Sequence, residues 1–139
     1  MHSIWKREMD LATINKSSQN TLASHLGIEF IEISNDSLTA RMPVDQRTVQ
    51  PLRMLHGGAS VVLAETLGSA AAIMTLPHDQ YCVGLEINAN HIRSVKSGEV
   101  IGTARPVHLG QNTQVWHIEI LNEDQQLVCV SRLTMAVIK

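Results

Sequence analysis

A long apolar stretch in the middle of the chain constrains the fold more than any other feature. Residues 59–74 read ASVVLAETLGSAAAIM and contain one charged side chain, Glu65. Apolar residues occupy every side of a helix built from this stretch, so the sequence predicts a helix buried in the core. An ionised carboxylate away from water is costly unless it is paired or hydrogen-bonded. Glu65 is therefore predicted to be catalytic. The alternative is a helix edge that faces a groove or a subunit interface, where Ser69 or backbone amides cap the carboxylate.

Length and composition limit which kinds of protein this chain can be. The 139 residues predict one domain, residues 1–139. The net charge is −2 and the eleven Lys and Arg are scattered, so the sequence shows no electrostatic footprint for nucleic acid. Cys82 and Cys129 lie in apolar, strand-like runs without metal-ligand spacing, which predicts a reducing compartment and no metal. The first ten residues hold no apolar stretch long enough for a signal peptide or membrane span, so we expect a cytoplasmic protein.

Hydrophobic spacing predicts the order of the elements. Residues 8–25 predict one or two short helices, and residues 28–34 and 37–44 predict a hairpin. The long helix should end near Pro77, and four strands should follow at 81–93, 99–107, 113–121 and 127–138. This order lacks a βαβ rhythm, so we predict an α+β fold in which a mostly antiparallel sheet curls around the long helix. Exposed edge strands and an apolar flank predict a homodimer or a larger assembly.

Several sequence blocks resemble a known enzyme family. Gln50-Pro51, residues 55–60 (LHGGAS) and residues 63–69 (LAETLGS) resemble the motif of hotdog-fold acyl-CoA thioesterases, in the branch that hydrolyses aromatic acyl-CoA esters. Blocks at 4–7, 42–45, 84–91 and 108–110 resemble the 1,4-dihydroxy-2-naphthoyl-CoA hydrolases of menaquinone biosynthesis and the proofreading thioesterases of enterobactin synthesis. The resemblance implies hydrolysis of an acyl-CoA to the acid and CoA, with no cofactor besides the CoA of the substrate. Action on an acyl carrier protein, and acyl-CoA binding without turnover, are the alternatives.

The motif contains the residue types that thioester hydrolysis requires. The reaction needs an activated water or a carboxylate nucleophile, which Glu65 can supply, and a group that holds the developing oxyanion. The backbone N–H of Gly57, at the helix N-terminus, suits that second role. His56 is predicted to orient or hydrogen-bond the thioester, or else to bond a main-chain group. By resemblance Gln50 lies near the thioester carbonyl, although sequence alone favours a solvated loop residue. Ser69 shares a helix face with Glu65 and either holds the carboxylate or is a small packing residue.

A second set of residues is assigned to CoA by the resemblance. Strand alternation predicts that Val83, Leu85, Ile87, Ala89, His91 and Arg93 share one face. A basic group beside a Gly-containing turn suits phosphate, whereas a solvated strand end is the alternative. The predicted binding residues are Gly84, His91, Ile92, Arg93, Ser94, His108, Leu109, Gly110, Gln111, Asn112 and Thr113.

Helix geometry limits how one chain can assemble this site. Glu65 lies about 12 Å along the helix from Gly57, so one helix cannot easily bring both to one carbonyl. The resemblance implies a site shared across a homodimer, and dimers that commonly pair into a homotetramer. Residues 52–54 (LRM) depart from the Phe-Gly that the family carries before Leu-His-Gly-Gly. Arg53 could reshape the acyl pocket or meet an acidic substituent, so naphthoyl, benzoyl and aliphatic acyl groups all remain open.

Overall fold

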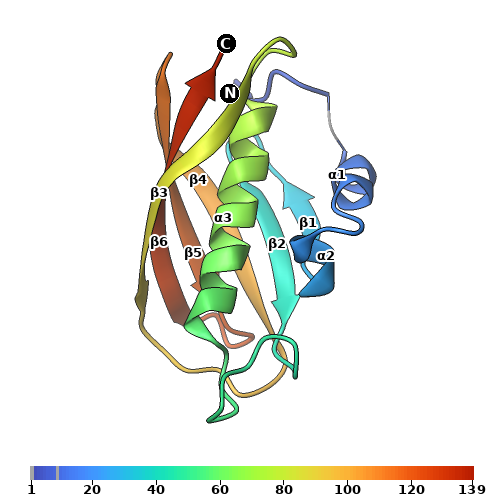
Figure 1. Cartoon of the computed structure of the whole chain (residues 1–139), viewed down its shortest axis with the longest axis vertical. Coiled ribbons are helices and arrows are strands. Elements are labelled where there is room, and N and C mark those ends of the chain that lie inside the picture. Colours follow the sequence, from blue (N-terminus) through green and yellow to red (C-terminus); the bar gives the residue numbers. More distant parts are fainter. Residues whose placement is uncertain (1, 9) are drawn as a thin grey trace.

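The computed structural model describes residues 2–8 and 10–139 of the chain. Within these residues the predicted α+β architecture is confirmed, because one antiparallel sheet wraps around a single long helix with two short helices beside it (Figure 1). The described parts of the N-terminal and C-terminal segments lie at the same end of the molecule (Figure 1).

Two short helices precede the sheet, as predicted. α1 spans Leu11–Ser17 and α2 spans Leu22–His25. Asp10 caps α1, because its carboxylate accepts a hydrogen bond from Thr13 N at 2.7 Å. α1 packs beside β1 (Glu29–Ile33), where the Asn15 amide donates to Phe30 O at 3.0 Å and accepts from Phe30 N at 2.8 Å. Asn15 therefore occupies backbone groups that an edge strand would otherwise leave open.

The sheet contains six strands within the described residues, in the order β1-β2-β4-β5-β6-β3. Every neighbouring pair is antiparallel. The bounds of the remaining strands are Leu38–Pro43 for β2, Tyr81–His91 for β3, Glu99–Leu109 for β4, Thr113–Leu121 for β5 and Leu127–Ile138 for β6. These bounds agree with the predicted strands to within two residues. β4 extends to Leu109, so His108 and Leu109 belong to a strand and not to the turn.

The long helix α3 (Gly57–Met74) packs on one face of the sheet and contacts β2 to β6. Its sheet-facing side is buried and consists mainly of Ala and Leu, with Leu63, Ala64, Leu67, Ala71 and Ala72 fully covered. α3 is long and apolar enough to cross a membrane by length and composition, yet half of it is buried in the protein. This burial is what a core helix requires.

The outer side of α3 differs from the prediction of a helix buried on all sides. Val62, Glu65, Ser69 and Ile73 are only half-buried. A single sheet covers one side of a helix, and α1 and α2 cover only part of the other. We call these four residues the open ridge. The ridge matches the alternative reading, in which the helix presents one edge to a groove or a subunit interface.

The predicted face of β3 is confirmed for Ile87, Ala89 and His91 but is wrong for Val83 and Leu85, because the strand contains a bulge. Gly84 pairs with Met135 and Ile87 pairs with Leu133, so the register with β6 shifts between Gly84 and Glu86. The extra residue reverses the alternation, and Gly84 and Ile87 both face α3 whereas Val83 does not. β3 ends at His91, so Arg93 lies beyond the strand.

β3 forms an edge of the sheet and is not covered by another strand among the described residues. Tyr81, Val83 and Leu85 are exposed there, and Leu85 retains 60% of its accessible surface. An open, apolar edge strand is a ready surface for pairing with another chain. The two edges of the sheet therefore differ, since α1 packs against β1 and no strand of the described chain pairs with the outer edge of β3.

Candidate active site

A cavity of about 270 Å³ lies at the N-terminal end of α3, and we call it the N-terminal cavity. Its lining combines the loop before α3, the first turn of the helix and the chain after β3. The structure thus brings together six of the predicted site residues, Gln50, Gly57, His91, Ile92, Arg93 and Ser94. Arg93 forms no ion pair within residues 2–8 and 10–139, so the cavity contains an uncompensated positive charge.

His56 caps α3 and is exposed to solvent. Its Nδ1 accepts a hydrogen bond from Gly58 N at 2.8 Å. A neutral imidazole that accepts at Nδ1 carries its proton at Nε2, so this tautomer presents an N–H donor away from the helix. Both predicted roles are thus compatible with one geometry: His56 bonds the main chain through one nitrogen and keeps a donor for a ligand on the other.

Gln50 begins a tight loop that leads into α3. The loop is closed by hydrogen bonds from Gln50 N to Met54 O and from Arg53 N to Gln50 O, each 2.8 Å. The Gln50 side-chain oxygen accepts from Leu52 N, and the amide NH2 has no hydrogen-bond partner in the part of the chain that the structure describes. Gln50 is a loop residue, as the alternative expects, but it is half-buried and lines the N-terminal cavity. Arg53 has a φ of 64°, in the left-handed region that favours glycine.

Gly57 supplies the free backbone donor of the first helical turn. Gly58 N bonds the His56 ring, and Ala59 N and Ser60 N bond His56 O at 3.0 and 3.2 Å. Gly57 N has no hydrogen-bond partner among the described residues. A Cβ atom on Gly57 would lie 2.9 Å from Nε2 of His91, so the imidazole of His91 packs directly against this glycine. Absence of a side chain at position 57 keeps the donor accessible.

Glu65 lies in the middle of the open ridge, two turns from the N-terminal cavity. Its carboxylate faces Gly84 of β3, where a Cβ atom would lie 2.7 Å from Glu65 Oε2. Glu65 forms no side-chain hydrogen bond or ion pair in the described part of the chain. Ser69 does not hold the carboxylate, because its hydroxyl points toward Met135 Sδ at 3.9 Å. The predicted support of Glu65 by Ser69 is therefore not observed in the single chain.

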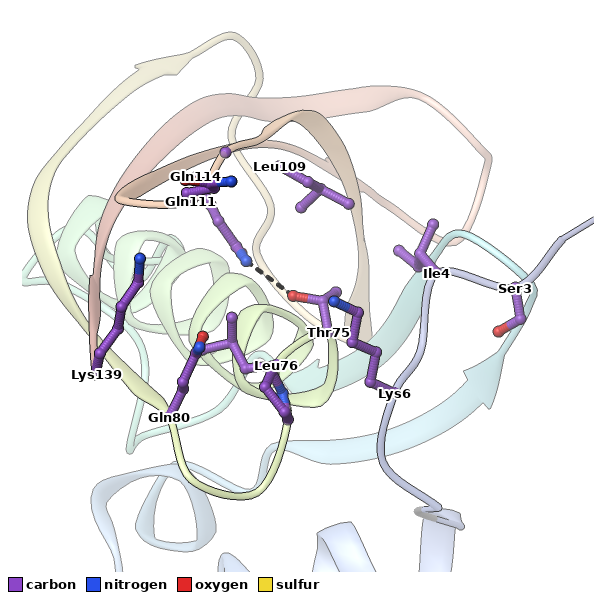
Figure 2. A pocket seen from close by; sticks show the side chains of 12 residues that line it. Ser3, Ile4, Lys6, Thr75, Leu76, Gln80, Leu109, Gln111, Gln114 and Lys139 are labelled. Atoms are coloured by element: carbon purple, nitrogen blue, oxygen red, sulfur yellow. Dashed lines mark hydrogen bonds between the residues drawn. The ribbon is translucent and has the colours of Figure 1, made fainter.

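The predicted residues of the β4–β5 region lie at the opposite end of α3. There, a cavity of about 570 Å³ surrounds the C-terminus of the helix, and we call it the C-terminal cavity. Leu109, Gly110 and Gln111 line it together with Lys6 and Lys139 (Figure 2). Figure 2 also shows the buried Gln114 amide donating to Thr75 Oγ1, at 2.8 Å. The β4–β5 turn is held by hydrogen bonds from Gly110 N to Thr113 O and from Val137 N to Asn112 O, both 2.9 Å.

The two predicted CoA-binding segments are therefore not brought together in one chain. The N-terminal cavity holds residues 91–94 and the C-terminal cavity holds residues 109–111. The 18 residues of α3 separate them by about 27 Å. Gly84 belongs to neither cavity and instead lies beside Glu65.

A third depression, of about 420 Å³, runs between α3 and the pair α1 and α2, and we call it the side groove. Ser69 and Ile73 of the open ridge line it, with Ala70 and Thr66 of α3 and Phe30 of β1. Ser69 is one turn from Glu65, so the groove begins beside the carboxylate. Sequence reasoning did not find this groove, because it depends on how α1 and α2 pack.

Sequence reasoning also missed Ser60, which is buried and lines the N-terminal cavity. Its position inside the LHGGAS block was a signal that the sequence contained. No group of three or more His, Cys, Asp or Glu side chains that could hold a metal occurs in residues 2–8 and 10–139.

Comparisons with known proteins agree on one family. Residues 52–129 match the model of the thioesterase superfamily. A 1,4-dihydroxy-2-naphthoyl-CoA hydrolase from Escherichia coli K12 is 50% identical over 135 residues, which cover 97% of this chain and 99% of the relative. A proofreading thioesterase, EntH, from Cronobacter turicensis is 51% identical over 134 residues, which cover 96% and 98%.

Solved structures extend this agreement to the fold. A thioesterase from Haemophilus influenzae has a TM-score of 0.97 and 50% identity, covering 98% of this chain and 95% of that one. A thioesterase variant from Staphylococcus aureus has a TM-score of 0.82 and 36% identity, covering 85% and 98%. That protein was crystallised with alanine replacing a glutamine and, separately, a glutamate, at the same sequence separation as Gln50 and Glu65 here. The predictions of a hotdog fold and of a thioesterase are confirmed, and the chain belongs to the thioesterase superfamily.

Proposed function

We propose that this protein hydrolyses acyl-CoA thioesters to the free acid and CoA, with Glu65 as the catalytic carboxylate. One observation carries the proposal: the only charged side chain of α3 lies on its open ridge, facing a strand position that has no side chain. The Glu65 carboxylate forms no ion pair and no side-chain hydrogen bond with the described residues, so it stays available for reaction.

The site is proposed to form between two copies of the chain. If two β3 edges pair antiparallel about a two-fold axis, the Tyr81 end of one strand meets the His91 end of the other. The C-terminal cavity of one subunit then approaches the N-terminal cavity of its partner. The same pairing brings Glu65 of one subunit toward the first turn of α3 in the other subunit. Glu65 and the Gly57 N–H then need not come from one helix, on which they lie about 12 Å apart. The exposed Val83 and Leu85 would be covered by this pairing.

The chemistry follows from the groups available. Glu65 takes a proton from a water molecule, and the hydroxide attacks the thioester carbon. The carbonyl oxygen becomes an oxyanion that accepts a hydrogen bond from Gly57 N at the positive end of the α3 dipole, and the Gln50 amide can donate to it as well. The C–S bond then breaks, and CoA leaves as a thiolate that recovers a proton. In the alternative, Glu65 attacks the carbon itself and water hydrolyses the resulting anhydride.

The acyl group is proposed to enter the side groove. The groove starts at Ser69, beside Glu65. Its lining combines apolar residues with hydroxyl side chains: Ile14, Leu22, Ala23, Phe30, Ala70 and Ile73, with Ser17, Ser18, Thr21 and Thr66. Its volume lies in the range of ordinary small-molecule sites. An aromatic acyl group suits such walls, and the similarity to a 1,4-dihydroxy-2-naphthoyl-CoA hydrolase supports a bicyclic aromatic substrate and a place in menaquinone biosynthesis.

The substrate can be tested by free-thiol release from benzoyl-CoA, 1,4-dihydroxy-2-naphthoyl-CoA and a medium-chain acyl-CoA. The proposal predicts turnover of at least one, with the aromatic esters preferred. Faster release from an acylated carrier protein would instead favour the proofreading activity for which one relative is named. Tight acyl-CoA binding without thiol release from CoA or carrier would contradict hydrolysis.

The shared site can be tested by complementation. Glu65→Gln and Gln50→Ala each damage a different half of the proposed site, so each homodimer should be nearly inactive. Refolding the two variants together should restore about a quarter of the wild-type activity, because half of the dimers are mixed and each has one intact site. No recovery, with mixed dimers demonstrated by mass spectrometry, would contradict a site shared between subunits. The same mass spectra would report whether dimers pair into the proposed tetramer, and cell fractionation would test the proposed cytoplasmic location.

A further inference from the structure

Two buried serine residues form no side-chain hydrogen bond among the described residues. Ser60 in α3 is 1% exposed and Ser131 in β6 is 3% exposed. The Ser131 oxygen is sealed from solvent and unpaired. The Ser60 side chain also forms no hydrogen bond within the described chain, but it lines the N-terminal cavity. A sealed hydroxyl without a partner, such as that of Ser131, destabilises a protein, whereas a hydroxyl that opens into a cavity can bond water or a ligand.

The position of Ser60 places its hydroxyl near another unpaired donor. Ser60 follows Gly57 by three residues, so the two lie one turn apart on α3, with a rise of about 4.5 Å. The N–H groups of residues 58, 59 and 60 are all bonded to His56, whereas Gly57 N is free among the described residues. The floor of the cavity therefore contains a free backbone N–H and a free hydroxyl next to each other in the helix.

The other polar groups of the cavity indicate what Ser60 would bind. Arg93 can only donate hydrogen bonds, and the Gln50 amide has its NH2 unpaired because the oxygen is already engaged. No carboxylate lines this cavity. The remaining lining includes the apolar residues Met54, Leu55, Ile92 and Val128. A site with these walls suits an uncharged or anionic chain that carries hydrogen-bond acceptors.

We propose that Ser60 is a substrate-binding residue, whose hydroxyl donates a hydrogen bond to a carbonyl oxygen of the bound thioester. The inference rests on the proposed function and adds to it a residue from the first turns of α3. Two carbonyl sources fit this chemistry: the thioester carbonyl itself and an amide carbonyl of the pantetheine arm. If Ser60 served only as a small packing residue, alanine would serve equally well and would remove the unpaired hydroxyl.

The test compares Ser60→Ala with Ser131→Ala. Both changes delete one hydroxyl that forms no hydrogen bond among the described residues and leave no large void, so neither variant should be less thermally stable than the wild type. Only Ser60→Ala should lose activity, by about tenfold or more in kcat/KM. Ser131→Ala is the matched control, since its hydroxyl does not line the N-terminal cavity.

A second substrate separates the two carbonyl sources. The S-ethyl thioester of the preferred acid lacks the pantetheine amides but keeps the reacting carbonyl. A loss that persists on this substrate, mainly in kcat, assigns Ser60 to the thioester oxygen. A loss seen only with the CoA ester, mainly in KM, assigns it to a pantetheine amide.

Different results would overturn the role of Ser60 and the thioesterase function on which it rests. If wild type and Ser131→Ala hydrolyse the CoA ester and Ser60→Ala does so within twofold of them, this proposal is overturned and the thioesterase stands. A clear drop in the melting temperature of Ser60→Ala alone would mark a structural role and also overturn it. If the wild type hydrolyses no thioester, both proposals fall together.

Discussion

Glu65 and Gly84 face each other across the space between α3 and β3, and a Cβ atom on Gly84 would lie 2.7 Å from Glu65 Oε2. A Cβ atom does not come this close to an oxygen, so the carboxylate keeps this position only because position 84 has no side chain. The bulge in β3 lies at the same place, between Gly84 and Glu86. The resemblance assigned Gly84 to CoA, whereas its place beside Glu65 gives it a role in positioning the carboxylate.

Gly84→Ala should therefore displace Glu65 and reduce kcat by about tenfold or more, with a smaller change in KM. Glu65→Asp shortens the side chain by one methylene and makes room for the added methyl group. In a double-mutant cycle, adding Gly84→Ala to Glu65→Asp should cost much less activity than adding it to the wild type.

A glycine elsewhere in the sheet controls for general damage. A Cβ on Gly102 of β4 would lie 2.8 Å from Leu67 Cδ1, in the apolar core and away from the carboxylate. Gly102→Ala should lower the melting temperature more than it lowers kcat. Equal losses of kcat from Gly84→Ala in both backgrounds would mean that the methyl group does not act through Glu65.

Gly57→Ala should impair the site through His91. The new Cβ would fall 2.9 Å from His91 Nε2, so the ring must move or the first turn of α3 must shift. We expect a loss of thiol release of about tenfold or more. Adding His91→Ala removes the clashing ring and should recover part of kcat in the double variant. If His91→Ala and Gly57→Ala simply multiply their losses, the contact with His91 is not the cause.

Arg53→Gly should stabilise the protein. Arg53 adopts a φ of 64°, which glycine adopts readily and a residue with a Cβ does not. Glycine relieves this backbone strain in the folded protein, but it also gains more conformational freedom in the unfolded chain. The first effect is larger, so the free energy of unfolding should rise by about 0.5–1 kcal/mol. Arg53→Ala keeps the Cβ and removes the charge, so it should not gain this stability. Urea denaturation of the three proteins measures the difference, and a less stable Arg53→Gly would contradict it.

The two buried thiols should make stability fall at alkaline pH. Burial raises the pKa of Cys82 and of Cys129, because it disfavours the thiolate. The unfolded chain ionises these groups above about pH 8.5, whereas the folded protein keeps them protonated. The two protonated thiols thus contribute fully to stability below that pH. This contribution is lost as the pH rises through the raised pKa values of the folded protein. Denaturation at pH 7 and pH 10 tests this. Replacing both cysteines with alanine should flatten the difference, and an unchanged slope would refute the assignment.

The sequence predicted the elements of this fold because its signals are local. The alternation of Leu38, Ala40, Met42 and Val44 and the apolar run of residues 59–74 report burial directly, and β2 and α3 lie where they predict. The β3 bulge was missed, since one extra residue leaves no composition signal and reverses every face before it. The open ridge was only the alternative prediction, because an apolar helix has the same sequence pattern whether its outer side packs against its own chain or faces a groove.

The candidate site was predicted as a set of residue types and not as an arrangement. The chemistry of thioester hydrolysis pointed to Glu65 and to the helix start at Gly57. Sequence could not reveal that residues 91–94 and 109–111 line cavities at opposite ends of α3, because that depends on how strands pair. Ser60 was overlooked for a similar reason: an unpaired buried hydroxyl can be recognised only after its neighbours are known.

The most direct test of this account is thiol release from an acyl-CoA by the wild type, Glu65→Gln and Glu86→Gln. Glu86 lies on β3, on the face of the sheet away from α3, and its carboxylate accepts from Asn88 Nδ2 at 3.2 and 3.3 Å. Glu86→Gln is therefore a matched control that also removes one carboxylate. The account predicts that Glu65→Gln keeps its melting temperature and acyl-CoA binding but loses about a thousandfold in kcat, while Glu86→Gln stays near wild type. A folded Glu65→Gln protein that retains kcat within tenfold of wild type would contradict the central role of Glu65.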